Sequence, residues 1–207
     1  MPDDSSSETN EPDHRHSLIL ATARRHFMTH GYALTRMESV SREAGVSTAT
    51  LYAFFPGKAE LFSAVIYDAA EDFGRQMAKV RAASGTPREQ LLVFAQSYAG
   101  FMRDPLVRAI FRLVMAERPR FHEVAMRFFE KGRTDFGMVL MDALARMVDR
   151  GELKLEKPSW AAGQLLGMIE HPVFFVPLVT GDEVRARRPI EQIAEDAVET
   201  FLARYGA

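Results

Sequence analysis

The residues best suited to chemistry lie just after position 46, and their side chains are suited to contact nucleic acid. Four small residues follow one another there: Ser47, Thr48, Ala49 and Thr50. Ser and Thr hydroxyls can bond several base edges, and Ala or Thr methyl groups can pack against the thymine methyl. No Arg, Asn or Gln follows up to Phe54, so we expect base readout through small contacts, helped by Arg36. The alternative is that these residues only cap and fill a helix.

Two short helices joined by a tight turn must position these residues. Thr35 and Glu38 have the spacing of a capping box, which predicts where the first helix starts. Its narrow apolar or small face comprises Met37, Val40, Ser41 and Ala44. Gly45 can take a positive φ at the turn, and Ser47 is predicted to cap a second helix over residues 48–54. This is a helix-turn-helix pattern, whose second helix enters the major groove.

Three pieces of sequence between Ile19 and Val65 carry a family resemblance. They are ILATARRHFMTHGY (19–32), ALTRMESVSREAGVSTATLYAFF (33–55) and PGKAELFSAV (56–65). This region resembles the N-terminal DNA-binding domain of the TetR family of bacterial transcriptional regulators. The hallmarks of that family are a first helix ending in Phe-x-x-x-Gly-Tyr, an Ala-Gly-Val-Ser turn and a Leu-Tyr-x-x-Phe-x-x-Lys tail. All three occur here in that order.

The resemblance implies that Thr35, Tyr52 and Lys58 bind the phosphate backbone. A hydroxyl beside a helix N-terminus, a phenol and an ammonium all suit that role. Arg42 is close enough in sequence to reach phosphate as well. Leu51 and Phe55 are predicted instead to be core residues that hold the second helix in place.

The charge distribution agrees with a DNA contact in the N-terminal part. The whole chain carries a net charge of −2, but residues 1–13 contain five acids and no Lys or Arg. Residues 14–60 contain six Lys or Arg against three acids, together with four histidines. Basic charge is therefore concentrated where the DNA motif lies, as phosphate attraction requires.

Helical periodicity runs through the rest of the chain and predicts an all-α fold of nine or ten helices. We expect a disordered tail at 1–13, a helix-turn-helix domain at 14–57 and a helical ligand-binding and dimerisation domain at 58–207. The first helix is predicted over about residues 15–29, ending at Gly31. A helix that starts at Pro158 is expected to bend or break at Pro172, and residues 181–189 are expected to form a polar loop.

The C-terminal two-thirds resembles the AefR-like group of the TetR family through DPLVRAIFRLVMAERPRFHEVAMRFFEKG (104–132) and GQLLGMIEH (163–171). The resemblance implies an effector cavity in this part. Candidate lining residues are mostly aromatic or Met: Phe94, Tyr98, Phe101, Phe111, Met115, Phe128, Phe136, Met168, His171, Phe174 and Phe175. For any one of them, ordinary packing in a bundle core is the alternative.

An apolar strip on the last two major helices predicts a homodimer interface, with burial inside one subunit as the alternative. Its residues recur at helical spacing: Leu165, Leu166, Ile169, Val173, Ile193, Ala197, Val198 and Phe201. Two-fold pairing would also double the contacts of one short recognition helix.

Several classes of function are disfavoured. The chain contains no Cys, and its His, Asp and Glu residues form no recognised ligand spacing, so we expect no metal site and no cofactor. No catalytic constellation is evident, so an enzyme is not expected. The longest apolar run, near residues 173–179, contains Pro177, so no membrane span is expected. The N-terminus has no signal-peptide pattern, which favours a cytoplasmic protein.

The combined hypothesis is a homodimeric transcriptional regulator that binds double-stranded operator DNA. Its simplest form is a repressor released from a near-palindromic operator by a small apolar effector. The alternatives are an activator, a regulator without an effector, and a helical ligand-binding module without DNA binding.

Overall fold

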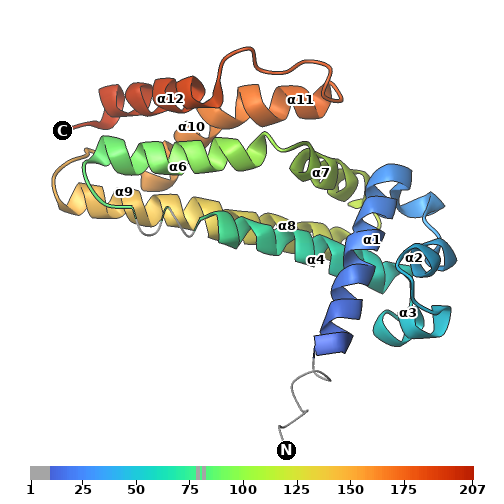
Figure 1. Cartoon of the computed structure of the whole chain (residues 1–207). Helices are drawn as coiled ribbons and strands as arrows, with labels where there is room; N and C mark the ends of the chain where they lie inside the picture. The colour runs from blue at the N-terminus through green and yellow to red at the C-terminus, as the bar shows by residue number, and fades with distance from the viewer. Residues whose placement is uncertain (1–9, 78–79, 81–82) are drawn as a thin grey trace, which may run out of the picture. The chain divides into compact units, whose positions relative to one another are not determined.

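The computed structural model describes residues 10–77, residue 80 and residues 83–207, and within these ranges the chain is helical without a β-strand (Figure 1). If each unbroken run of α- and π-helix is taken as one, these ranges contain nine helices. The all-α prediction is confirmed.

The first helix, α1 (Asn10–Leu34), is longer than predicted at both ends. Residues 1–9 of the expected tail lie outside the described residues, whereas residues 10–13 form the start of α1. A proline at position 12 is compatible with this, because the first turn of a helix needs no backbone N–H donor. Gly31 takes φ 72° and ψ 174°, which kinks α1 close to its predicted end.

The described chain forms two compact units, each made of more than one stretch of sequence. Unit 1 runs up to Ala69 and also includes Leu113–Met126. Unit 2 comprises Ala70–Arg112 and Arg127–Ala207. As a result α4 (Lys58–Gln76), α7 (Pro105–Glu117) and α8 (His122–Gly132) each contribute residues to both units.

An aromatic cluster explains why the turn between α7 and α8 belongs to unit 1. The Phe121 ring of this turn lies 4.6 Å from the ring of Phe62 and 4.9 Å from that of Tyr32, centroid to centroid. Phe27, fully buried on α1, completes the cluster at 5.3 Å from Phe62. The Tyr32–Phe121 and Phe27–Phe62 pairs are edge-to-face, an arrangement that adds to the stability gained from burial alone.

Unit 2 is a bundle in which α12 (Ile190–Tyr205) packs mainly against α6 (Pro87–Met102) and also against α10 (Pro158–Glu170) (Figure 1). The remaining elements of this unit are the π-helix η1 (Arg133–Met138), α9 (Val139–Asp149), the π-helix η2 (His171–Phe175) and α11 (Val176–Val179). Thr86 and Glu89 form a complete capping box at the start of α6, with Pro87 in the first turn.

The helix from Pro158 to Val179 is continuous, contrary to the expected break at Pro172. Proline cannot donate the usual backbone hydrogen bond, and the chain adopts π-helix here, with the Val176 N–H bonded to the His171 carbonyl. Pro177 does not interrupt the run either. This 22-residue helix is long and apolar enough to cross a membrane by length and composition alone, a test that core helices of soluble proteins also pass. One face of it packs against α6 and α12.

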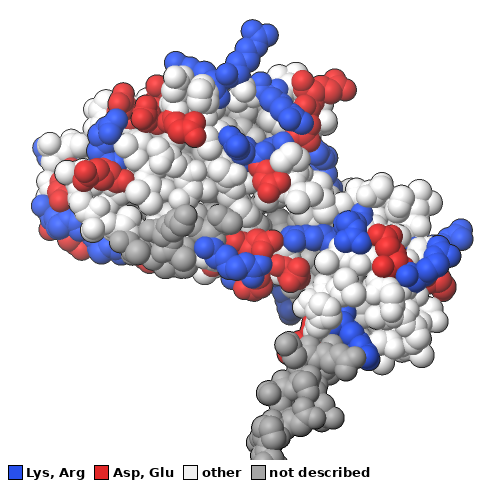
Figure 2. Space-filling view, viewed as in Figure 1, with Lys and Arg blue, Asp and Glu red and all other residues white. Residues whose placement is uncertain are grey.

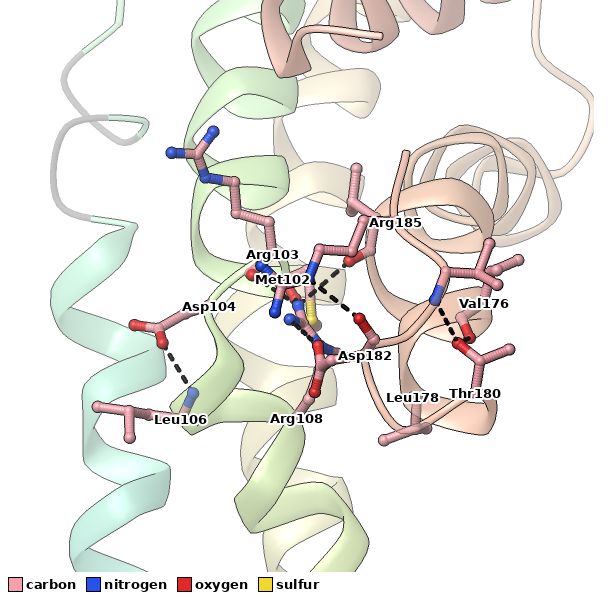
Figure 3. Close-up of polar contacts among 12 residues, drawn as sticks. Met102, Arg103, Asp104, Leu106, Arg108, Val176, Leu178, Thr180, Asp182 and Arg185 are labelled. Carbon is pink, nitrogen blue, oxygen red and sulfur yellow. Dashed lines mark hydrogen bonds and ion pairs between the residues drawn. The ribbon is translucent and has the colours of Figure 1, made fainter. Parts of the chain in front are cut away.

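A buried arginine joins three segments of unit 2 (Figure 3). Arg108 on α7 is 2% exposed and donates to the carbonyls of Met102 and Arg103 at the end of α6. Its Nε also donates to Asp182 Oδ1 at 2.8 Å, and Arg112 donates to the other oxygen of that carboxylate at 2.8 Å. The two arginines therefore hold the loop after α11 against α7.

Candidate nucleic-acid interface

The helix-turn-helix forms as predicted, from α2 (Met37–Glu43) and α3 (Thr48–Phe54). Gly45 has φ 67° in the turn, a conformation that glycine adopts at little cost. The Ser47 hydroxyl accepts a hydrogen bond from the Thr50 N–H at 3.0 Å and caps α3. Leu51 is fully buried and Phe55 is 5% exposed, so both are core residues as predicted.

The outer face of α3 carries the residues predicted to contact bases. Thr48, Ala49 and Tyr52 are exposed and lie on neighbouring positions of the helix surface. Thr50 is half-buried, and its hydroxyl lies 2.8 Å from that of Ser47. Tyr52 is 44% exposed, and its hydroxyl has no hydrogen-bond partner among the described residues. These side chains are therefore available to a ligand as large as a duplex.

Thr35 lies elsewhere than predicted. It is 2% exposed, and its hydroxyl donates to the Gly31 carbonyl at 2.7 Å. The N-cap of α2 is Arg36, without a side-chain capping bond, so the predicted Thr35–Glu38 capping box is wrong. The kink at Gly31 is the physical reason, because it breaks the helical ladder and leaves a carbonyl that the Thr35 hydroxyl satisfies. A buried hydroxyl cannot contact phosphate, so that role is withdrawn.

Lys58 is also occupied within the protein. Its ammonium donates to the carbonyls of Tyr32, Ala33 and Thr35 at 2.8, 3.1 and 3.0 Å. It lies 4.6 Å from the centroid of the Tyr32 ring. An ammonium has three protons, and all three are used here. Lys58 therefore caps the end of α1, and the predicted phosphate contact would require its ammonium to release one of these carbonyls.

Replacing Lys58 with methionine is expected to lower the melting temperature by about 3–12 °C. The change leaves carbonyls without their charged donor, at a cost of about 1.5–3 kcal/mol, and each kcal/mol shifts Tm by about 2–4 °C at this chain length. Circular dichroism melting measures the effect, with the exposed Lys154→Met as the matched control. Unchanged melting combined with weaker DNA binding would restore the phosphate role.

Arg36 and Arg42 are exposed, which leaves both side chains accessible for the predicted DNA contacts. Sequence reasoning missed an ion-pair network beside them. Glu43, on α2, accepts hydrogen bonds from Arg25 at 2.9 Å and from His26 Nε2 at 2.6 Å, both on α1. These bonds, that of Arg25 first, hold the pKa of the Glu43 carboxyl below its usual value. The network ties α2 to α1 and offsets an acidic charge near the basic surface.

The predicted effector-site residues are not all brought together. Phe94, Tyr98, Phe101, Phe128 and Phe136 are buried in the core of unit 2, and Phe111 and Phe174 are half-buried beside them. Met115 belongs to unit 1 and is 51% exposed, so it is not part of this group. Phe175 is 52% exposed on the surface of η2. The ring of Phe73, on α4, is a member of the cluster that the sequence set omitted.

Met168 and His171 line a surface groove between α10–η2 and α12 instead. One part of the groove has a volume of about 550 Å³ and includes Met168, His171 and Thr200. Another part, of about 420 Å³, includes Gly167 and shares Met168 and Thr200 with the first. Ala197 also lines the first part, and Phe201 lines the second.

The predicted dimer-interface residues are largely buried inside one chain. Leu165, Ile169, Val173, Ile193, Ala197, Val198 and Phe201 are each less than 9% exposed, and only Leu166 is half-buried. Their apolar periodicity marks the face through which α10 and α12 pack on α6. This corresponds to the alternative of burial inside one subunit. The outward face of α10 and η2 carries Trp160, Gly163, Gly167, His171 and Phe175. Glycines add nothing to an apolar count, which is why the sequence did not reveal this face.

Acidic and basic side chains are interspersed over unit 2 on the visible face in Figure 2, as expected for a region whose charges nearly balance.

Two family models match this chain and establish the family to which it belongs. Residues 89–207 match the AefR-like transcriptional repressor C-terminal domain, and residues 19–65 match the bacterial regulatory proteins of the tetR family. The chain belongs to the TetR family.

Individual relatives agree with this TetR-family assignment. A TetR-family regulator from Mesorhizobium loti has 25% sequence identity and a TM-score of 0.81, covering 95% of this chain and 98% of its own. The flavonoid-responsive regulator FrrA has 28% identity and a TM-score of 0.73, covering 94% and 98%. The uncharacterized HTH-type regulator YhgD of Bacillus subtilis is 25% identical over 156 residues, which are 75% of this chain and 72% of YhgD.

Proposed function

We propose that this TetR-family protein is a cytoplasmic homodimeric repressor that reads a near-palindromic operator with α3 and is released by a small aromatic effector. The main observation in support of DNA binding is the exposed face of α3. Thr48, Ala49 and Tyr52 point outward from a helix that buried Leu51 fixes to the rest of unit 1. The matched C-terminal model, described as that of a repressor, supports the direction of regulation.

DNA binding is tested with the duplex upstream of the gene that encodes this protein. We expect specific binding that weakens as salt rises, because phosphate contacts release counterions. Absence of binding at low salt would contradict the proposal. Increased rather than decreased transcription on binding would support the activator alternative.

Replacing Tyr52 with phenylalanine is expected to weaken DNA binding about tenfold or less across all sequences. The hydroxyl would donate to a phosphate, and one such bond contributes about 0.5–1.5 kcal/mol. The dependence on salt should not change, since no charge is removed. Arg42→Ala is the paired variant, and it should reduce the salt slope by about one. Fluorescence anisotropy over a salt series measures both, and unchanged affinity for Tyr52→Phe would remove its phosphate role.

The outward face of α10 and η2 is the proposed dimer contact. Trp160 is 69% exposed and Phe175 52% exposed, which is unusual for large apolar side chains on one helix face. Between them, Gly163 and Gly167 have no atom within 4 Å of the position where a Cβ would lie. Glycines four residues apart let a second helix backbone approach closely. The groove beside Gly167 gives such a helix a place to lie.

Replacing Gly167 with leucine is expected to raise the dissociation constant of the dimer about 10- to 100-fold. Overpacking a close contact costs about 1–3 kcal/mol, although leucine favours the helix itself. Analytical ultracentrifugation measures the change. Gly100→Leu, at another helical glycine with open space, is the control and should leave the dimer intact. Equal behaviour of the two variants would place the contact elsewhere.

The effector part of the proposal rests on the aromatic cluster in unit 2. Phe136 lies 5.0 Å from Tyr98 and 5.3 Å from Phe101, and Phe111 lies 4.8 Å from Phe174, all between ring centroids. Such rings suit a flat aromatic ligand. FrrA, at 28% identity, is named as flavonoid-responsive, which favours the same ligand class. The ligand must bind the form that does not hold the operator more tightly, or it would release nothing.

A further inference from the structure

A buried phenol and a half-buried carboxylate are paired at the edge of the core of unit 2. The Tyr98 hydroxyl, on α6, donates a hydrogen bond to Oε1 of Glu170, the last residue of α10. Tyr98 is 2% exposed. Burial raises the pKa of the Glu170 carboxyl, although the bond from Tyr98 opposes this, and burial also raises the pKa of the Tyr98 hydroxyl. A pair of polar groups in such a place is costly unless it has further partners.

Glu170 has unused capacity to accept hydrogen bonds. A carboxylate offers about four lone-pair positions, and Tyr98 fills one of them. No second donor reaches Glu170 from the described residues. Its partner Tyr98 is in an aromatic environment, since the Tyr98 ring lies 5.7 Å from that of Phe94 and 5.0 Å from that of Phe136, centroid to centroid. A molecule with an apolar ring and one donor group would satisfy both features.

We propose that Glu170 and Tyr98 form the polar end of the effector site and select aromatic molecules that carry a hydrogen-bond donor. The donor is a phenolic hydroxyl or an aryl-linked ammonium, and it bonds to the free Glu170 oxygen. The Tyr98 hydroxyl holds the carboxylate in position, and the surrounding rings contact the ligand body. This inference rests on the ligand response proposed above and names the chemistry of that response.

Two π-helices border this pair. Phe136 belongs to η1, and η2 begins directly after Glu170. A π-helical turn holds more residues than an α-helical one, and such turns are frequent at functional sites. Tyr98 and Glu170 line neither part of the groove between α10 and α12. The pair therefore does not belong to that groove, and a ligand ring reaches it by displacing rings such as that of Phe136.

Three probes that share a biphenyl skeleton test, on the full-length protein, whether the ligand requires a hydrogen-bond donor. They are biphenyl-4-ol, 4-methoxybiphenyl and biphenyl-4-ylmethanamine, and their affinities are measured by calorimetry. The wild-type protein should prefer a donor-bearing probe to the ether by about tenfold, the size expected for one hydrogen bond to a charged acceptor. A preference for the amine over the phenol identifies an ammonium ligand, and the reverse identifies a phenol. Equal affinity for all three, or no saturable binding, overturns the proposal.

Variants assign the preference to these residues. Glu170→Gln should reduce the donor preference to about parity, whereas Tyr98→Phe should keep the preference with weaker binding. Glu195→Gln, on the exposed side of α12, should behave as wild type. A donor preference that survives in Glu170→Gln overturns the assignment. Melting curves verify folding, and Glu170→Gln should melt no lower than wild type, because a neutral amide is cheaper to bury.

The experiment separates this inference from the proposed function. Operator binding is measured without any probe. A protein that binds DNA but has equal affinity for the three probes therefore contradicts only the inferred role of Glu170 and Tyr98. Conversely, a protein that binds no DNA at low salt loses the proposed function, while calorimetry still reads the donor preference.

Discussion

Replacing Arg108 with methionine is expected to destabilise the protein by about 3 kcal/mol and to lower its melting temperature by about 6–12 °C. The reason is the number of groups that depend on one buried guanidinium. Asp182 would keep only Arg112, and the carbonyls of Met102 and Arg103 would lose their donor. Breaking a buried ion pair costs about 3–5 kcal/mol, and we take the lower end because the Asp182 side chain is 15% exposed. Urea unfolding measures the loss.

Two variants control this result. Arg103→Met removes an exposed arginine close in sequence and should change stability by less than about 0.5 kcal/mol. Asp182→Asn tests the charge. Partial burial raises the pKa of the Asp182 carboxyl, but hydrogen bonds from Arg112 and Arg108 outweigh it and hold the pKa below its usual value. The charge of Asp182 therefore stabilises the folded protein fully at pH values above the pKa of this carboxyl in the unfolded chain. This stabilisation is lost as the pH falls through the lower pKa of the carboxyl in the folded protein. A wild-type advantage over Asp182→Asn that did not shrink below about pH 4 would contradict the role of the charge.

The parts of the DNA motif that follow from local chemistry were predictable. Gly45 satisfies a positive φ, and Ser47 satisfies an N–H three residues later, so both roles depend only on nearby backbone. Leu51 was predictable as a core residue because it lies on the apolar face of a short amphipathic helix, and only that face can be buried. These three features are enough to specify a helix-turn-helix.

The roles of Thr35 and Lys58 were not predictable, because each depends on where another element ends. The carbonyls that they satisfy are released at the end of α1, and the Lys58 partners lie 23–26 residues away in sequence. A sequence motif specifies that a lysine occupies this position, but it does not specify which hydrogen-bond acceptors surround its ammonium. The same applies to Arg108, whose carboxylate partner Asp182 lies 74 residues away in sequence.

The faces of α10 and α12 show a second limit. Apolar periodicity identified Leu165, Ile169 and Phe201 correctly as buried, yet burial by the same chain and burial by a partner give the same pattern. The exposed face was hidden because Gly163 and Gly167 carry no side chain that a pattern could register. Only the placement of α6 and α12 separates the two cases.

Replacing Leu51 with alanine is expected to abolish specific DNA binding and to destabilise the protein by about 2–5 kcal/mol. Leu51 is fully buried and is the one buried residue of α3, a helix of seven residues. A helix this short is not stable alone in water, so its order depends on tertiary packing. Loss of that packing would release Thr48, Ala49 and Tyr52 from their fixed positions. Anisotropy measures DNA binding, and circular dichroism measures stability in the same samples.

The matched control is Leu34→Ala, because Leu34 also lies in unit 1 but is 76% exposed. It should change neither stability nor affinity appreciably. Leu51→Met conserves most of the volume and should cost less than about 1.5 kcal/mol while retaining DNA binding. A Leu51→Ala protein that is destabilised but still binds the operator with wild-type affinity would show that α3 is ordered by the DNA itself. Rigid presentation of α3 by unit 1 would then no longer explain recognition.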